Sequence, residues 1–207
     1  MYLSKLTLNP TPACRQVLRD LSNPYEMHRT IMRGFPGKAK GGPGRILFRV
    51  EPTAPDEPPV VLVQSDKTPD WSDLLARADY LLDAQTKEVR LSLRAGQRLR
   101  FRLRANPAVK RDGRRHGLLK EDDQQRWLQR KAEQAGFAPV DFAVRRKDRL
   151  HSRKRADGET MAQTHLAVDF EGVLKVNDPD ALVKAIAAGI GPAKGFGFGL
   201  LSIAPAG

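Results

Sequence analysis

The spacing of hydrophobic and polar residues predicts a series of strands and helices in the first half of the chain, and the same order of elements in the second half. Near the start, Tyr2, Leu6 and Leu8 alternate with polar residues, which predicts a strand. The first half as a whole predicts a strand over 2–8, helices opening at Thr11 and Pro24, strands over 46–50 and 60–64, a helix over 71–82 and a strand over 89–93. This order is β-α-β-β-α-β, the order of a ferredoxin-like fold.

The second half gives the same order of elements. It predicts a strand over 98–104, a helix over 121–135, strands over 140–146 and 166–176, and a strand over 198–203. Between the last two strands it predicts a helix that is capped by Asp178, has Pro179 at its first position and stops at Gly189. We therefore expect an α+β protein of two tandem ferredoxin-like (RRM-like) domains. The expected boundaries are residues 1–94 for the N-terminal domain and 95–207 for the C-terminal domain.

The charge of the chain points to a polyanionic partner. Its 207 residues include 36 Lys and Arg against 24 Asp and Glu, a formal charge of +12. Residues 1–96 carry 14 basic and 11 acidic residues, whereas residues 97–207 carry 22 and 13, so we expect most phosphate contacts in the second half. Nucleic acid is the favoured partner and an anionic membrane surface the second choice. No apolar run approaches the roughly 18 residues that span a bilayer, so we expect no membrane span, and we expect nucleic acid rather than a membrane as the partner.

The cysteine count limits the chemistry and the compartment. The single Cys14 excludes an internal disulfide and a cysteine-based metal cluster. It fits a reducing cytoplasm, and no signal peptide is recognisable. The His, Asp and Glu residues do not have the spacing of metal ligands either, so we expect no metal and no cofactor.

Three features of the second half could bind phosphates, and each has a plainer structural explanation. The run Arg98–Arg104 alternates Arg with apolar residues, which places four arginines on one strand face without interleaved acids; the alternative is a solvated sheet face. The basic run 145–155, followed by the turn signal Asp157-Gly158, predicts a hairpin along an RNA helix or a disordered charged loop. The glycine-rich segment 189–199 could cradle a phosphate or form a glycine-kinked strand.

The segment Asn23–Arg29 is the strongest candidate for chemistry. Asn23 can cap a helix, Pro24 suits its first position and Glu26 completes a capping box. Tyr25 and His28 then lie three residues apart on one helix face. A phenol and an imidazole at the positive end of a helix suggest acid/base chemistry on a polyanion, although a lone histidine is more often structural.

A set of segments in order along the whole chain forms a recognisable pattern: Leu6–Pro10, Asn23–Arg29, 58–64, 69–71, 96–107, Phe170–Gly172 with Val176, and 189–202. Together these segments resemble the CasE family of CRISPR-associated endoribonucleases. The resemblance implies tandem ferredoxin-like domains, a CRISPR repeat stem-loop as substrate, and the other Cascade subunits as partners. It also implies metal-independent cleavage at the 3′ base of the stem, which leaves a 2′,3′-cyclic phosphate and a product that stays bound.

By this resemblance, His28 and Tyr25 map onto the active-site pair of the family. Arg33 is our candidate for the cation that stabilises charge on the phosphoryl oxygens, with Arg29 less favoured. The candidate RNA-binding residues are Arg29, Arg98, Arg100, Arg102, Arg104, Lys110, Arg111, Arg114, Arg115, Arg145, Arg146, Lys147, Arg149, Arg153, Lys154 and Lys194. The alternatives are a non-catalytic subunit that binds an RNA hairpin and a general basic protein associated with ribosomes or DNA.

Overall fold

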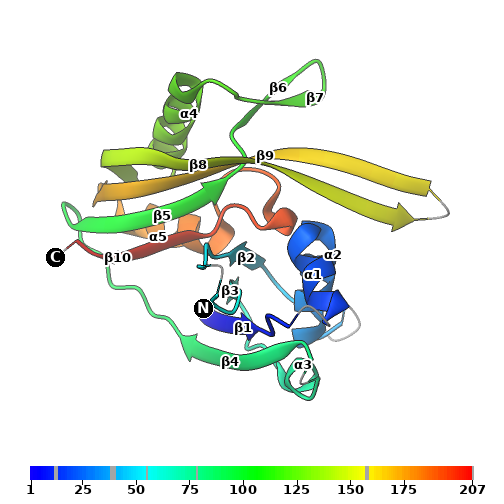
Figure 1. Ribbon diagram of the computed structural model, residues 1–207. Coiled ribbons are helices and arrows are strands. Elements are labelled where there is room, and N and C mark those ends of the chain that lie inside the picture. The colour runs from blue at the N-terminus through cyan, green and yellow to red at the C-terminus, as the bar shows by residue number, and fades with distance from the viewer. Residues whose placement is uncertain (12–13, 38–40, 55, 78, 157–158, 207) are drawn as a thin grey trace. The chain divides into compact units, whose positions relative to one another are not determined.

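The chain forms two compact units. The computed structural model describes all residues except 12–13, 38–40, 55, 78, 157–158 and 207, and describes the backbone alone at 154–156 and 159–161. The N-terminal unit comprises Met1–Arg90 together with His151–Gln163 and Gly195–Gly197. The C-terminal unit comprises Leu91–Leu150, Thr164–Lys194 and Phe198–Gly207. Each unit contains one four-stranded sheet (Figure 1).

The sheet of the N-terminal unit has the strand order of a ferredoxin-like fold. Its strands are β1 (Tyr2–Leu8), β2 (Ile46–Val50), β3 (Val60–Ser65) and β4 (Leu81–Glu88), and they lie in the order β2-β3-β1-β4. The pairs β1–β3, β1–β4 and β2–β3 are all antiparallel. The helices are α1 (Arg15–Ser22), α2 (Pro24–Ile31) and α3 (Ser72–Leu75), and a 3₁₀ turn, Met32–Gly34, follows α2.

One face of this sheet carries the core of the unit. Leu6 and Leu8 of β1 are buried with Val17 of α1 and with Met27 and Ile31 of α2. The alternation that predicted β1 is thus confirmed, because every second side chain faces these helices.

Two elements of this unit differ from the expectation. The helix expected over 71–82 is only the single turn α3, and the final strand is β4 rather than 89–93. The apolar spacing was misleading because Leu75 and Leu82 are exposed, by 41% and 52%. Residues 81–88 instead pair with β1 along its whole length, so strand pairing overrides the local helical pattern.

The first helix also begins later than expected. The expected start at Thr11 is wrong, because α1 begins at Arg15 after a turn in which the Thr11 N–H donates to the Asn9 Oδ1. Within α1, Val17 is buried, whereas Leu18 is 51% exposed.

The C-terminal unit repeats the same strand order. Its strands β5 (Arg98–Ala105), β8 (Phe137–Ala156), β9 (Glu159–Val176) and β10 (Leu201–Pro205) lie in the order β10-β5-β9-β8, with helices α4 (Glu121–Gln134) and α5 (Pro179–Ala188). The ends of β8 and β9 at His151–Gln163 belong to the N-terminal unit. The fold of two ferredoxin-like arrangements is therefore confirmed.

Local signals decide several boundaries in this unit. Asp178 caps α5 by accepting from the Ala181 N–H, and Gly189 ends the helix with a φ of +78°, as expected. The last strand begins at Leu201 rather than Phe198. The preceding glycines hold the chain in an irregular path, which includes the 3₁₀ turn η3 (Lys194–Phe196).

A hairpin that was not expected, β6 (Ala108–Arg111) and β7 (Arg114–Gly117), precedes α4. Its turn, Asp112-Gly113, has φ values of +48° and +75°, the conformation that this dipeptide favours.

Candidate nuclease site

The start of α2 is held by a helix cap and by hydrogen bonds to strand β8. The Asn23 Oδ1 accepts from the Tyr25 N–H at 3.2 Å, and Pro24 takes the first helical position. The same side chain bonds the backbone of Arg153 in β8, with Nδ2 donating to its carbonyl at 3.0 Å and Oδ1 accepting from its N–H at 3.3 Å. One asparagine thus fixes both the helix of His28 and the strand of the basic run.

The expected capping box is not formed. A capping box would pair the Asn23 N–H with the Glu26 carboxylate. Asn23 is also the C-terminal cap of α1, so its N–H donates to the carbonyl of Arg19 instead. The Glu26 carboxylate lies 3.7 Å from the Arg19 guanidinium and 3.3 Å from that of Arg29.

His28 is half-buried and held by packing. Its ring stacks on Phe48 of β2, with ring centroids 6.2 Å apart and planes inclined by 24°. Its Nδ1 is buried and has no hydrogen-bond partner among the described residues. Burial lowers the pKa of His28 below its ordinary value, because the charged imidazolium would lose hydration. His28 is therefore a neutral imidazole at neutral pH.

The two other residues proposed for catalysis lie on either side of His28 along the chain. Tyr25 is partly buried in the first turn of α2, three residues before His28. Arg33, in the 3₁₀ turn, forms an ion pair with Asp73 of α3. Its charge is thus already balanced, which sequence reasoning missed because Asp73 is far away along the chain. Arg29 is 63% exposed and paired with Glu26.

A buried polar cluster fixes the other end of α2. The Asp20 side chain of α1 is fully buried and accepts hydrogen bonds from the Thr30 Oγ1 at 2.6 Å and the Tyr80 hydroxyl at 2.9 Å. The Arg19 guanidinium also donates to this carboxylate. Burial and the adjacent carboxylate raise the pKa of Tyr80, so its hydroxyl stays protonated and donates. Nothing in the sequence pattern indicated this cluster.

The arginines of β5 have acidic partners from other strands of their sheet. Arg102 pairs with Glu171 at 2.6 Å, and Arg104, only 12% exposed, lies 3.7 Å from Asp148 and 3.5 Å from Asp169. The expectation of an arginine face without interleaved acids is therefore wrong for this pair. The cross-strand neighbours in β8 and β9 were not visible in the sequence. The other two arginines, Arg98 and Arg100, are exposed, and the Arg100 Nε donates to the carbonyl of Pro205.

The basic run of β8 is exposed but partly neutralised. Arg146 pairs with Asp148, Lys147 with Glu121 at 2.7 Å, and Arg145 lies 3.9 Å from Glu171. Arg149 and Arg153 are exposed. The side chain of Lys154 and the expected turn at 157–158 lie outside the described residues.

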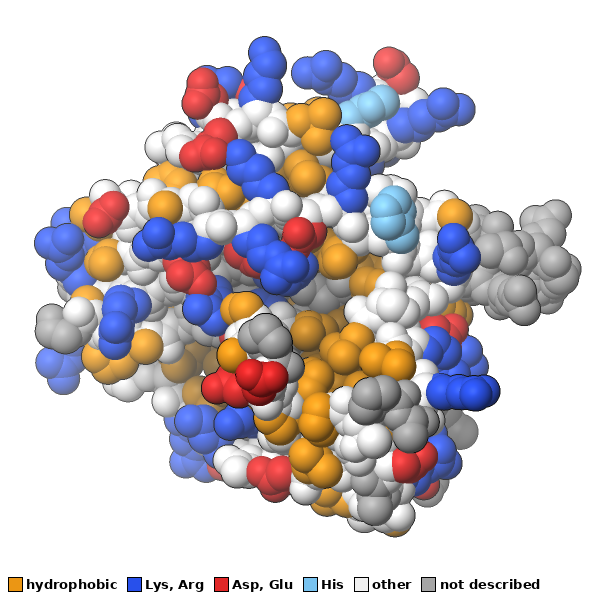
Figure 2. Space-filling model, viewed as in Figure 1, with side chains coloured by type: hydrophobic (Ala, Val, Ile, Leu, Met, Phe, Trp, Pro, Cys, Tyr) orange, Lys and Arg blue, Asp and Glu red, His pale blue; other side chains and the backbone are white. Residues whose placement is uncertain are grey.

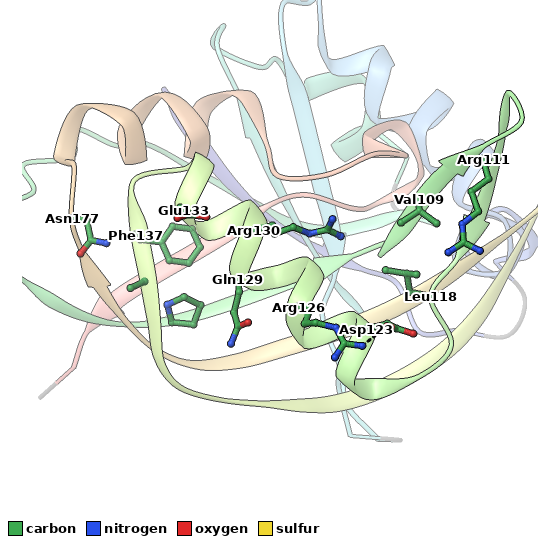
Figure 3. A pocket seen from close by; sticks show the side chains of 12 residues that line it. Val109, Arg111, Leu118, Asp123, Arg126, Gln129, Arg130, Glu133, Phe137 and Asn177 are labelled. Atoms are coloured by element: carbon green, nitrogen blue, oxygen red, sulfur yellow. Dashed lines mark hydrogen bonds and ion pairs between the residues drawn. The ribbon is translucent and has the colours of Figure 1, made fainter.

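Further basic residues gather at α4 and the β6–β7 hairpin in the C-terminal unit (Figure 2). The Lys and Arg residues of the hairpin, Lys110, Arg111, Arg114 and Arg115, are all exposed. A groove of about 770 Å³ separates this hairpin from α4, with Arg111, Arg126 and Arg130 around it (Figure 3). A second pocket of about 490 Å³ is lined by Lys110, Arg115, Lys131 and Lys194 beside the turn that follows α5.

The described part of the chain offers neither a metal-ligand cluster nor a membrane-spanning helix. No group of three or more His, Cys, Asp or Glu side chains among its residues could hold a metal ion. None of the described helices has both the length and the apolar character needed to cross a membrane.

Comparison with known proteins gives the family. The model of a family described as CRISPR associated protein matches residues 1–205. The chain is 41% identical to the CRISPR-associated endoribonuclease Cse3 of Thermus thermophilus, covering 99% of this chain and 100% of the relative. It is 34% identical to the CRISPR system Cascade subunit CasE of Escherichia coli K12, again covering 99% and 100%.

Solved structures agree with these matches. A structure of CRISPR endoribonuclease Cse3 bound to 19 nt RNA gives a TM-score of 0.88 at 41% identity, covering 99% of this chain and all of that one. The CRISPR-associated protein Cas6e of Escherichia coli K-12 gives 0.72 at 33% identity, with the same coverage. The family resemblance read from the sequence is thus confirmed. The chain belongs to the CRISPR-associated protein family that contains the endoribonuclease Cse3 and the Cascade subunit CasE.

Proposed function

We propose that this protein binds the stem-loop of a CRISPR repeat within precursor RNA and cleaves the strand at the 3′ base of the stem. The observation that carries the proposal is the placement of His28. A neutral imidazole lies on a capped helix whose capping residue is hydrogen-bonded to the basic β8 strand. The relative Cse3, named as an endoribonuclease and matched over its full length, supports the same activity, and the relative CasE supports a place in Cascade.

The reaction needs no nucleophile from the protein. The 2′-hydroxyl of the RNA attacks the adjacent phosphorus, and the bond from phosphorus to the 5′ oxygen breaks. The products are a 2′,3′-cyclic phosphate and a 5′-hydroxyl. Because Nδ1 of His28 is buried, Nε2 is the atom left to accept the 2′-hydroxyl proton. The Tyr25 hydroxyl then donates the proton that the 5′ oxygen takes up.

The remaining candidates bind or stabilise the RNA. Arg33 would stabilise charge on the phosphoryl oxygens once the substrate phosphate competes with Asp73 for its guanidinium. The basic residues of β5, β8 and the β6–β7 hairpin would contact backbone phosphates. We further propose that the protein acts in the cytoplasm, keeps its product and joins the other Cascade subunits.

One cleavage experiment tests the proposal. The protein is incubated with its repeat RNA in EDTA, and the termini of the products are identified. Cleavage at the base of the stem with a cyclic phosphate supports the proposal. Tight binding without cleavage would show a non-catalytic RNA-binding subunit, and cleavage that requires an added divalent metal would refute the metal-independent mechanism.

The pH dependence follows from the neutral state of His28. A general base must be unprotonated, so kcat/KM should stay level from neutral pH down to the pKa of free His28 and fall below it. Because burial lowers this pKa, the midpoint should lie below about 6.5, the ordinary value of histidine. A pH series of kcat/KM tests this, and a rate that rises on acidification would contradict the role as base.

The salt dependence of RNA binding tests the basic part of strand β8. Replacing Arg149 and Arg153 with Ala should weaken stem-loop affinity and reduce the salt slope by about one for each phosphate that the variant no longer binds. The matched control replaces Arg90 and Arg94, two exposed arginines near the end of β4. Titrations at several salt concentrations measure both slopes. Equal slopes for the two double variants would exclude this part of β8 from the interface.

A further inference from the structure

His28 lacks the usual anchor of a catalytic imidazole. Such rings are commonly oriented by a hydrogen bond from Nδ1 to a carbonyl or carboxylate. Here Nδ1 is buried without a partner among the described residues. The orientation of the ring must therefore come from packing, and the stacked aromatic partner is Phe48.

Phe48 is itself held in place from a distant part of the chain. It is 1% exposed and lies in β2, within the core of the N-terminal unit. Gly197, from the glycine-rich segment, belongs to the same compact unit and lies against the Phe48 ring. A Cβ at Gly197 would lie 3.1 Å from the Phe48 Cε2 and 3.5 Å from its Cζ.

Gly197 also has a φ of +83°, which L side chains rarely adopt. The position therefore requires glycine for two independent reasons, the backbone conformation and the closeness of the aromatic ring.

We propose that Phe48 and Gly197 are positioning residues for His28: the backbone at Gly197 fixes the Phe48 ring, and that ring fixes the imidazole. This inference rests on the proposed function and adds a role for the glycine-rich segment inside the N-terminal unit. The role is separate from phosphate binding. The same ring covers part of the imidazole from water, which agrees with the lowered pKa of His28.

Gly197→Ala, with Gly96→Ala as control, tests the inference. Gly96 has nearly the same φ, +82°, but a Cβ there meets no atom within 4 Å. Both variants place an alanine at a similar positive φ, and only at Gly197 would the added Cβ press on Phe48. Because misplacing a reacting group by about 1 Å can cost about 100-fold in rate, we expect single-turnover cleavage to fall by about 10- to 100-fold for Gly197→Ala. RNA affinity should stay within a few-fold, and Gly96→Ala should cleave like the wild type.

A second pair of variants reports on the ring directly. Phe48→Leu removes the ring that stacks on His28, and Phe35→Leu removes another buried ring of the same core, one that packs on Trp71. In NMR titrations of the free protein, the His28 pKa should rise toward its ordinary value in Phe48→Leu and stay unchanged in Phe35→Leu. Thermal unfolding of all four variants confirms that they are folded.

Two results would overturn the inference. One is equal cleavage rates for Gly197→Ala and Gly96→Ala, and the other is a His28 titration in Phe48→Leu that matches the wild type. Failure of the wild-type protein to cleave would instead refute the proposed function. The NMR titrations would still decide whether Phe48 controls the environment of His28.

Discussion

Replacing His28 with alanine is expected to slow cleavage of the repeat stem-loop by about 10²- to 10⁴-fold, the usual contribution of a general acid or base. The loss should appear in the chemical step, because the substrate keeps its 2′-hydroxyl and the protein keeps its basic residues. RNA affinity should therefore change little. Single-turnover kinetics at saturating protein measure the first effect, and equilibrium titrations measure the second.

The matched control for this variant is His165→Ala. His165 is the other histidine whose pKa is lowered by burial, and its Nδ1 is hydrogen-bonded to the Asn106 Nδ2 in the C-terminal unit. It has no role in the proposed reaction, so its removal should leave the cleavage rate near that of the wild type. A His28→Ala variant that cleaves as fast as His165→Ala would show that the site has been misassigned.

Replacing Asp20 with alanine is expected to destabilise the fold by about 3–5 kcal/mol, because the hydroxyls of Thr30 and Tyr80 would lose their buried acceptor. The end of α2 would lose its connection to α1 at the same time. Urea unfolding, followed as the shift of the midpoint at constant slope, measures the change.

Asp83→Ala is the control for a carboxylate removed from the surface. Asp83 is exposed and pairs with the nearby Gln85 in β4. Its replacement should change stability by less than about 0.5 kcal/mol, as is usual at exposed positions. If Asp20→Ala were no more destabilising than Asp83→Ala, the buried cluster would not be what fixes α2.

The sequence predicted best where one signal decides the local structure. The alternation in β1 indicated the strand because its apolar side chains face the helices. Asn23 and Asp178 indicated two helix starts. Each side chain accepts a hydrogen bond from a backbone N–H in the first turn, which has no partner within the helix. The α+β class and the order of elements followed from signals of this kind.

The sequence predicted worst where the outcome depends on partners that are distant along the chain. The segment 71–82 has helical spacing, yet pairing with β1 makes its end the start of a strand. The sequence suggested that the arginines of β5 have no acidic neighbours, but carboxylates from β8 and β9 pair with Arg102 and Arg104. The sequence likewise gave no sign that Arg33 is paired, whereas in the structure it forms an ion pair with Asp73 of α3.

In the candidate site, too, the sequence predicted the local features but not the contacts with distant parts of the chain. Tyr25 and His28 could be found from the sequence because one capped helix carries both. The environment of His28 could not, because Phe48 comes from β2 and Gly197 from the glycine-rich segment. The hydrogen bonds from Asn23 to Arg153, which join the helix to the basic strand, were equally hidden.

The most direct test of the central claim uses a repeat stem-loop with a single 2′-deoxy nucleotide at the cleavage site. The protein should bind this RNA as tightly as the unmodified repeat and leave it uncut, because the attacking hydroxyl is missing. Cleavage of the deoxy RNA at the same position would contradict the account, since another nucleophile would then be breaking the strand.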